Sequence, residues 1–277
     1  MAYPRILTIQ DISCVGQCSL TVALPILSAC GAETCVLPSA VLSTHTGGFR
    51  GFTFRDLTDD IPAIRAHWEK ERIAFDAIYT GYLGSTRQIG YVADIFDTML
   101  AENGRIVVDP AMADNGKLYV GFDNDYVAGM RTLCARADVI LPNLTEACLL
   151  TDTPYRETYD EAFVRALLEK LAAQGAERVA LTGVSYTPDE TGVVICENGA
   201  TRYYRHRRLP RIFHGTGDIY SSAFVGAWMR GNDLYDAARI AADYTVACIA
   251  CTQDDATHWY GVKFETALPK LIRALGD

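Results

Sequence analysis

Short apolar runs that alternate with longer amphipathic runs constrain the fold of this chain most strongly. The short runs are rich in Val, Ile and Leu, as buried strands are, and lie at residues 6–9, 34–37, 77–79, 105–108, 139–141 and 179–181. The longer runs have helical spacing and include residues 19–29, 86–102 and 160–173. This order predicts an α/β fold, in which helices flank both faces of a mostly parallel central sheet. No linker-like segment interrupts it, so we expect residues 1–277 to form one domain.

The pattern changes after the sixth predicted strand. Residues 192–196 and 201–205 read as an antiparallel hairpin, because Asn198 and Gly199 between them favour a tight turn. The chain then reads as helices only, at residues 219–230, 234–248 and 264–275.

Polar or glycine-rich residues follow most of the predicted strands. These residues, in chain order, are Gln10 and Asp11, Thr80 to Tyr82, Asp109 and Pro110, Pro142 and Asn143, and Thr182 and Gly183. Ligands of open α/β sheets bind at the carboxyl ends of the strands. We therefore expect the functional site at this edge of the sheet.

A second feature lies between the hairpin and the first of the late helices. Gly215, Thr216 and Gly217 precede Asp218, and a helix-forming run follows. Glycines let backbone N–H groups approach an anion, and the start of the helix adds unpaired donors. The segment fits a phosphate cradle with a carboxylate base beside it, although alone it is equally typical of a tight turn before a helix.

Composition narrows the class of partner. A formal net charge of −9 disfavours binding to nucleic acid or to an anionic membrane, so a small metabolite is expected. No apolar stretch approaches the roughly 20 residues of a spanning helix, and no signal-like segment opens the chain, which favours a cytoplasmic protein. The nine cysteines are expected to be reduced thiols, because their number is odd. Zinc or redox chemistry at Cys248 and Cys251, completed by Cys14 and Cys18, is the disfavoured alternative.

Taken together and in this order, six segments resemble the pyridoxal kinase (vitamin B6 kinase) family of the ribokinase-like superfamily. They are residues 9–10, 43–49, 80–85, 109–114, 142–146 and 215–218, and the resemblance spans nearly the whole chain. It implies a ribokinase-like fold and ATP-dependent phosphorylation of the 5′-hydroxymethyl group of pyridoxal, pyridoxine or pyridoxamine. Family members are commonly homodimers, so a homodimer is expected here as well.

The resemblance also implies a role for each matched residue. Asp218 is the expected catalytic base, and the amides from Gly215 through Thr216 to Gly217 form the expected anion hole. The other expected nucleotide and metal contacts are Asn143, Glu146 and Thr182 for ATP, and Asp109, Asp114 and Glu146 for Mg²⁺. The three acids suit Mg²⁺, which takes few carboxylates together with water and phosphate. A monovalent cation such as K⁺ beside Thr182 is a further expectation.

On the acceptor side, the resemblance points to Asp11, His45, Thr46 and Tyr82 as substrate-binding residues. Asp11 departs from the family, whose members commonly have serine there, and we hypothesise that its carboxylate favours a protonated ring or a cationic substituent. Ala113 also departs, where relatives often have glycine. Both His45 and His214 have a plain alternative, a neutral imidazole bonded to nearby backbone.

Several alternatives stay open from the sequence. Hydroxymethylpyrimidine kinases often have His-Gly-Thr-Gly-Cys, and this chain shares His214 but has Asp218 instead of that cysteine. A sugar or nucleoside kinase and a noncatalytic pyridoxal phosphate carrier or sensor are the other candidates. The glycine-rich residues 47–52 read as a flap over the acceptor pocket or as an ordinary crossover. The basic residues within 202–211 read as a solvated hairpin face, as ATP phosphate contacts, or, with least support, as an RNA-binding patch.

Overall fold

A computed structural model of the chain describes residues 3–211 and 213–276. Within these residues, nine strands form one sheet in the order β11-β10-β9-β8-β5-β4-β1-β2-β3, and β6 pairs with β7 separately. The strands are β1 (Arg5–Ser13), β2 (Glu33–Leu42), β3 (Phe54–Asp56), β4 (Phe75–Thr80), β5 (Leu100–Val108), β6 (Ala113–Asp114), β7 (Lys117–Leu118), β8 (Val139–Ile140), β9 (Arg178–Val184), β10 (Glu190–Glu197) and β11 (Ala200–Arg207).

The middle of the sheet is parallel and its two ends are antiparallel. Strands β2, β1, β4, β5, β8 and β9 pair in parallel, whereas β3 pairs with β2, and β10 with β9 and β11, in the antiparallel sense. The predicted mostly parallel sheet is therefore confirmed, and so is the hairpin. Its turn uses positive φ angles of 50° at Asn198 and 82° at Gly199.

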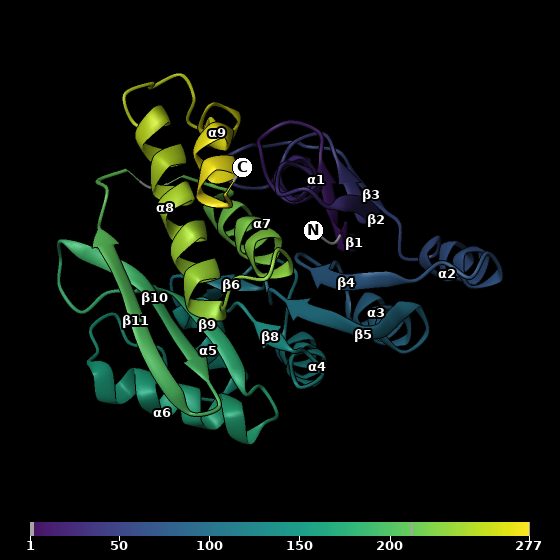
Figure 1. The fold of residues 1–277 in the computed structure, drawn as a ribbon, viewed down its shortest axis with the longest axis horizontal. Coiled ribbons are helices and arrows are strands. Elements are labelled where there is room, and N and C mark those ends of the chain that lie inside the picture. Colours follow the sequence, from purple (N-terminus) through teal and green to yellow (C-terminus); the bar gives the residue numbers. More distant parts are fainter. Residues whose placement is uncertain (1–2, 212, 277) are drawn as a thin grey trace.

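Helices cover both faces of the sheet (Figure 1). The helices are α1 (Leu20–Ala29), α2 (Ile61–Lys70), α3 (Thr86–Met99), α4 (Asn124–Cys134), α5 (Leu144–Leu150), α6 (Glu161–Ala173), α7 (Thr216–Met229), α8 (Leu234–Thr252) and α9 (Phe264–Ala274). Apolar residues of α2 to α6 form one core with the sheet, and those of α1 and α7 to α9 form the other. None of the described helices has the length and apolar character needed to cross a membrane.

The two cores explain why the strands read as continuous apolar runs. Neighbouring residues of a strand point to opposite faces: Ile78 of β4 joins the core under α3 and α4, and Tyr79 joins the core under α7. Because both faces are buried, most residues at the strand centres are apolar, and the polar ones there, such as Thr8 and Gln10 of β1, are themselves fully buried. The candidate site lies towards the carboxyl ends of the strands.

The structure corrects several element boundaries. The helix expected at residues 86–102 ends at Met99, since Leu100 already pairs with Phe75 in the sheet. Helix α8 continues to Thr252, four residues beyond its expected end. Helix α4 escaped sequence analysis because Gly129 lowers its helix propensity. That glycine lies against α3, where an added Cβ would stand 3.3 Å from the Ile89 side chain.

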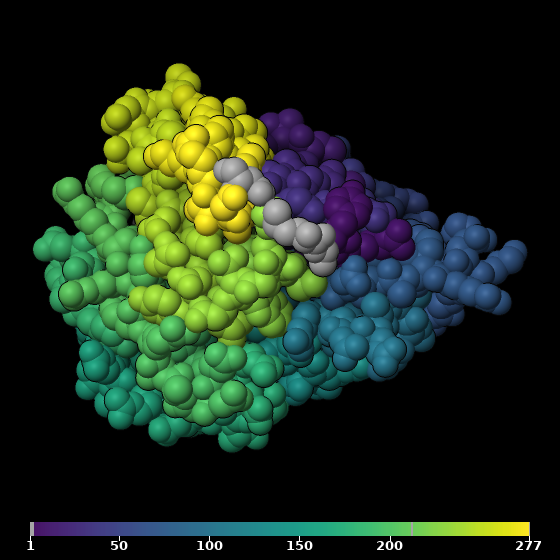
Figure 2. Space-filling view, viewed as in Figure 1, coloured from purple at the N-terminus to yellow at the C-terminus, as the bar shows by residue number. Residues whose placement is uncertain are grey.

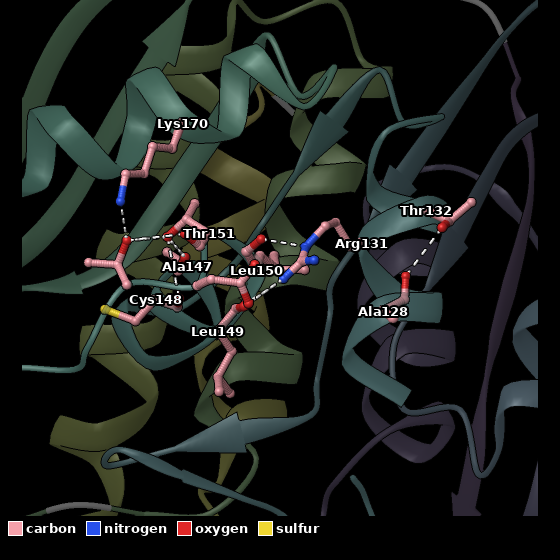
Figure 3. Close-up of polar contacts among 11 residues, drawn as sticks. Ala128, Arg131, Thr132, Ala147, Cys148, Leu149, Leu150, Thr151 and Lys170 are labelled. Carbon is pink, nitrogen blue, oxygen red and sulfur yellow. Dashed lines mark hydrogen bonds and ion pairs between the residues drawn. The ribbon is translucent and has the colours of Figure 1, made fainter. Parts of the chain in front are cut away.

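Helix α5 is fixed at its carboxyl end by a neighbouring helix (Figure 3). The Arg131 guanidinium of α4 donates to the carbonyl oxygens of Leu150, at 2.6 Å, and Leu149, at 3.2 Å. Positive charge at a helix carboxyl end is favourable, because the last carbonyl oxygens lack intrahelical partners. The anchor matters for the site, because the other end of α5 carries Asn143 and Glu146.

The two ends of the chain meet in one layer. Helix α1 packs against α7 and α9, and Figure 2 shows the yellow surface of the C-terminal helix beside the purple surface of the N-terminal segment. All nine cysteines are free thiols, and the described residues contain no group of His, Cys, Asp or Glu arranged to hold a metal ion by themselves. The structure thus gives no support to the zinc alternative.

Candidate functional site

The segment from Gly215 to Asp218 starts helix α7. The helix begins at Thr216, earlier than the sequence indicated, so Gly217 and Asp218 lie in its first turn. Its first intrahelical bond is donated by Ile219 to Gly215, and the N–H groups before it have no intrahelical partner. The positive end of the helix dipole adds to these donors. This helix start is therefore suited to bind an anion.

Gly215 is required by both conformation and space. It has a left-handed φ of 78°, and an added Cβ would lie 2.2 Å from the carbonyl oxygen of Gln17. Gly217 differs, because no atom lies within 4 Å of its would-be Cβ. Only the first of the two glycines is needed by the fold itself.

Asp218 has a pKa near neutrality. Burial raises the pKa of this carboxyl to about 7, and the charges of Asp109 and Asp11 add to the rise. The backbone N–H of Ser19 donates to Asp218 Oδ2 at 3.0 Å and lowers the pKa in part. A carboxylate in this range is an effective general base at neutral pH.

Two further carboxylates, Asp109 and Glu146, lie buried close together. Asp109 accepts from Ser221 Oγ at 2.6 Å and from the Ala111 N–H at 3.2 Å. Burial raises its pKa to about 6. Burial, and next the charge of Asp109, raise the pKa of Glu146 to about 8.

Glu146 also closes a capping box at the start of α5. Its Oε2 accepts from the Asn143 N–H at 2.8 Å, while Asn143 Oδ1 accepts from the Glu146 N–H at 3.0 Å. Its Oε1 accepts from Met112 at 2.9 Å. The carboxylate therefore ties the segment after β5 to the start of α5, which is a structural role independent of any ligand.

The chemistry of these acids fits a divalent cation that keeps most of its water. No arginine or lysine among the described residues lowers the pKa of Asp109 or Glu146, so two adjacent buried acids lack a compensating charge. Asp114 is exposed, and its carboxylate accepts from Asn115. Mg²⁺ bound at Asp109 and Glu146 would take its remaining ligands from water and phosphate, which is its usual preference.

These raised pKa values predict that the protein without ligands loses stability as pH rises from about 5 to about 8. Folded Asp109, Asp218 and Glu146 hold protons that the unfolded chain has already released, so deprotonation favours unfolding in this window. We expect the free energy of unfolding to fall by several kcal/mol, since each unit of raised pKa is equivalent to about 1.4 kcal/mol, and Asp109→Asn to remove about a quarter of that fall. Urea unfolding in Mg²⁺-free buffer measures both; a stability that rises with pH would contradict the prediction.

An open cavity of about 490 Å³ lies beside these acids. Asp114, Asn143 and Thr182 line it together, as expected for residues at neighbouring strand ends. Its other lining residues include Tyr155, Tyr159, Gly183, Ser185, Tyr186 and Arg208. The aromatic side chains and backbone groups of this wall suit a planar ring joined to an anionic group.

The expected acceptor residues are not among the residues that line this cavity. Asp11 is 5% exposed. Burial, and next the charge of Asp11, raise the pKa of the half-buried Tyr82, whose ring stacks on Phe122 with centroids 5.4 Å apart. His45 is held by backbone, because Nε2 lies 2.6 Å from the Tyr260 oxygen and Nδ1 accepts from Gly47. Thr46 is exposed in the loop after β2.

The glycine-rich segment at residues 47–52 packs against aromatic rings. An added Cβ on Gly47 would lie 2.6 Å from the His214 ring, and one on Gly48 would lie 2.9 Å from the Trp259 ring. The rings of Phe49 and Trp259 are 4.7 Å apart. The glycines therefore allow this segment to pack closely against the loop before α9.

Two residues of the basic stretch form ion pairs, as expected for a hairpin face. Arg202 forms an ion pair with Asp233 and lies over the Tyr235 ring, while Arg205 pairs with Glu190. Arg208 differs, because it lines the cavity and donates to Ser185 Oγ at 3.1 Å.

Three residues of the site escaped sequence analysis. Ser221 was detectable, because it lies three residues after Asp218 and so on the same face of a helix. Tyr119 lies in the loop after β7, where burial, and next the charges of Glu146, Asp114, Asp109 and Asp218, raise its pKa. No sequence signal identifies Ser19, because its role depends on a positive φ of 56° that serine rarely adopts.

Comparison with known proteins finds relatives that match nearly the whole chain. The family model for phosphomethylpyrimidine kinase matches residues 27–262. A Bacteroides thetaiotaomicron structure assigned as a phosphomethylpyrimidine kinase, in a crystal form with pyridoxal, is 39% identical with a TM-score of 0.91, and the match covers 98% of this chain and 96% of that one. Pyridoxal kinase from Lactobacillus plantarum is 36% identical with a TM-score of 0.91, covering 98% of each chain. A Bordetella avium pyridoxine/pyridoxal/pyridoxamine kinase is 26% identical over 90% of this chain and 85% of its own length.

Proposed function

This chain belongs to the phosphomethylpyrimidine kinase family and has the ribokinase-like fold of its pyridoxal kinase relatives, and we propose that it phosphorylates the 5′-hydroxymethyl group of a B6 vitamer with ATP. The observation that carries the proposal is Asp218, a carboxyl with a pKa near 7 at a helix start that is rich in unpaired N–H groups. A relative 39% identical to this chain was crystallised with pyridoxal, which supports this class of acceptor.

The proposed reaction divides among three groups of residues. Asp218 accepts the proton of the acceptor hydroxyl as the oxygen of that hydroxyl attacks the γ-phosphorus of ATP. The amides from Gly215 through Thr216 to Gly217 stabilise the charge that develops on the phosphate oxygens. Bound Mg²⁺ would supply further charge neutralisation, held through Asp109 and Glu146, with Asp114 contributing through water.

The two substrates approach from opposite sides of Asp218. ATP occupies the cavity lined by Asn143 and Thr182, and Glu146 holds Asn143 in place there. The vitamer ring binds among Asp11, His45, Thr46 and Tyr82. A monovalent cation such as K⁺ beside Thr182, a homodimer and a cytoplasmic location are further parts of this proposal, and they rest on the family resemblance alone.

A hydroxymethylpyrimidine kinase is the second candidate, favoured by the family description and by His214 before Gly215. Both candidates are tested by ATP-dependent ADP release with Mg²⁺ and K⁺ against pyridoxal, pyridoxine, pyridoxamine and hydroxymethylpyrimidine. Turnover of a vitamer supports the proposal, and turnover of the pyrimidine alone supports the second candidate. Tight vitamer binding without ADP release would instead indicate a carrier or sensor.

Arg208 and Arg207 provide a matched test of the nucleotide site. Arg208 lines the cavity, whereas its neighbour Arg207 is exposed at the end of β11. We expect Arg208→Ala to raise the KM for ATP about 5- to 20-fold with little change in vitamer KM, since one charge-assisted contact is lost. Arg207→Ala should change neither constant by more than about twofold. Equal effects of the two substitutions would refute a specific phosphate contact.

A further inference from the structure

Asp11 lies at an irregularity of the central sheet. The pairing of β1 with β2 shifts register between Gln10 and Ile12, so that two residues of β2 face Asp11 alone. Such bulges redirect a side chain and are frequent beside active sites. At this position Asp11 is buried, and both of its oxygens are engaged, Oδ2 by Ser13 Oγ at 2.9 Å and Oδ1 by Ser19 Oγ at 2.5 Å.

Ser19 joins Asp11 to Asp218. It is the N-cap residue of α1, yet its hydroxyl makes no capping bond, because it donates to Asp11 instead. Its backbone N–H donates to Asp218 Oδ2 at 3.0 Å. One residue therefore contacts two carboxylates, through its side chain on one side and its main chain on the other.

The backbone of Ser19 is held in an uncommon conformation. Its φ of 56° and ψ of −131° lie in a backbone region that residues other than glycine rarely adopt. Gln17 also has a positive φ. Such a conformation persists only where its surroundings hold it. An antiparallel bridge to Ile12 and the bond to Asp11 are the contacts that do so. The same loop touches the start of α7, because the Gln17 carbonyl oxygen lies against Gly215.

We propose that Asp11 is a positioning residue for the catalytic base: it holds the Ser19 hydroxyl and thereby fixes the Ser19 N–H against the Asp218 carboxylate. This inference rests on the proposed function, in which Asp218 accepts the proton. This role of the aspartate is additional to its place beside the vitamer ring in the proposed function. Besides this N–H, the groups that face Asp218 are Asp109, Asp11, Cys18, Tyr79 and Tyr119.

Two serines on the same carboxylate provide the test. Ser13→Ala and Ser19→Ala each remove one buried hydroxyl that donates to Asp11, but only Ser19 also donates to Asp218, through its backbone N–H. We expect Ser19→Ala to lower kcat about 10- to 100-fold with vitamer KM nearly unchanged, because the base is misplaced. Ser13→Ala should keep kcat within about threefold of the wild type.

The acid limb of the pH profile gives a second measurement. Loss of a fixed N–H donor raises the pKa of a carboxylate, so the acid limb of kcat/KM should move up by about 0.5–1 pH unit in Ser19→Ala and not in Ser13→Ala. Asp11→Asn should lower kcat as Ser19→Ala does. The double variant should have a kcat no lower than that of Ser19→Ala alone, because both substitutions act through one contact. Equal effects of the two serines, or a changed vitamer ranking in Asp11→Asn with kcat unchanged, would overturn the proposal.

A titration without substrate separates this inference from the proposed function. The ¹³C resonance of the Asp218 carboxyl, identified by its loss in Asp218→Asn, reports its pKa directly in the whole protein. The midpoint is expected near 7 in the wild type and about 0.5–1 unit higher in Ser19→Ala. An unchanged midpoint overturns the positioning role even if the enzyme is active. A shifted midpoint supports it even if no vitamer is phosphorylated.

Discussion

Asp218→Asn is expected to lower kcat for vitamer phosphorylation about 10³-fold, while the KM values for ATP and vitamer change less than about threefold. Asparagine matches the shape of aspartate, and its Oδ1 can still accept the Ser19 N–H, so the loss reports proton transfer rather than packing. Steady-state ADP release with both substrates varied gives the two constants. Retention of more than about a tenth of wild-type kcat would exclude Asp218 as the base.

The chain offers a matched control for this substitution. Asp236 is the third residue of α8, as Asp218 is of α7, and it likewise carries a carboxylate in a first helical turn. The Asp236 side chain is 48% exposed and pairs with Arg239, so Asp236→Asn should leave kcat unchanged. The wild-type profile of kcat/KM should rise through pH 7, because the pKa of Asp218 is about 7 and the deprotonated form is active.

Gly215→Ala is expected to reduce the free energy of unfolding by about 2–4 kcal/mol and to abolish most activity. The left-handed φ of 78° disfavours alanine, and the new Cβ would meet the Gln17 carbonyl oxygen at 2.2 Å, where backbone cannot move away without disturbing the loop that contacts Asp218. Urea unfolding and vitamer-dependent ADP release measure the two effects.

Gly217→Ala is the comparison for that prediction. Its Cβ would meet no atom within 4 Å, and alanine favours a helical backbone, so stability should stay equal or rise by about 0.5–1 kcal/mol. Any loss of activity in this variant would then be caused by the methyl group in the anion site. If both alanine variants were equally stable, the close contact of Gly215 with Gln17 would not be important for folding.

The parts of the site that could be predicted from sequence share one property. Asp109 and Asn143 follow buried parallel strands and Thr182 lies near the carboxyl end of β9, and parallel strands end at one edge of a sheet whatever the details of the packing. The bond from Ser19 to Asp218 spans 199 positions of the chain and needs a backbone angle that no residue pattern encodes. The sequence pattern therefore predicted the edge of the sheet at which the candidate site lies, whereas the contacts of Asp218 depend on tertiary packing.

The placement of α1 has a consequence for synthesis of the chain. This helix is almost wholly apolar and packs against α7 and α9, which the ribosome makes some 200 residues later. Helix α1 can pack early against β1 and β2, its neighbours in the chain, but the part of its surface that contacts α7 and α9 has no native partner during translation, a situation that favours aggregation or chaperone binding. The packing of α1 is therefore completed, and the contact of Ser19 with Asp218 formed, only when nearly all of the chain has left the ribosome.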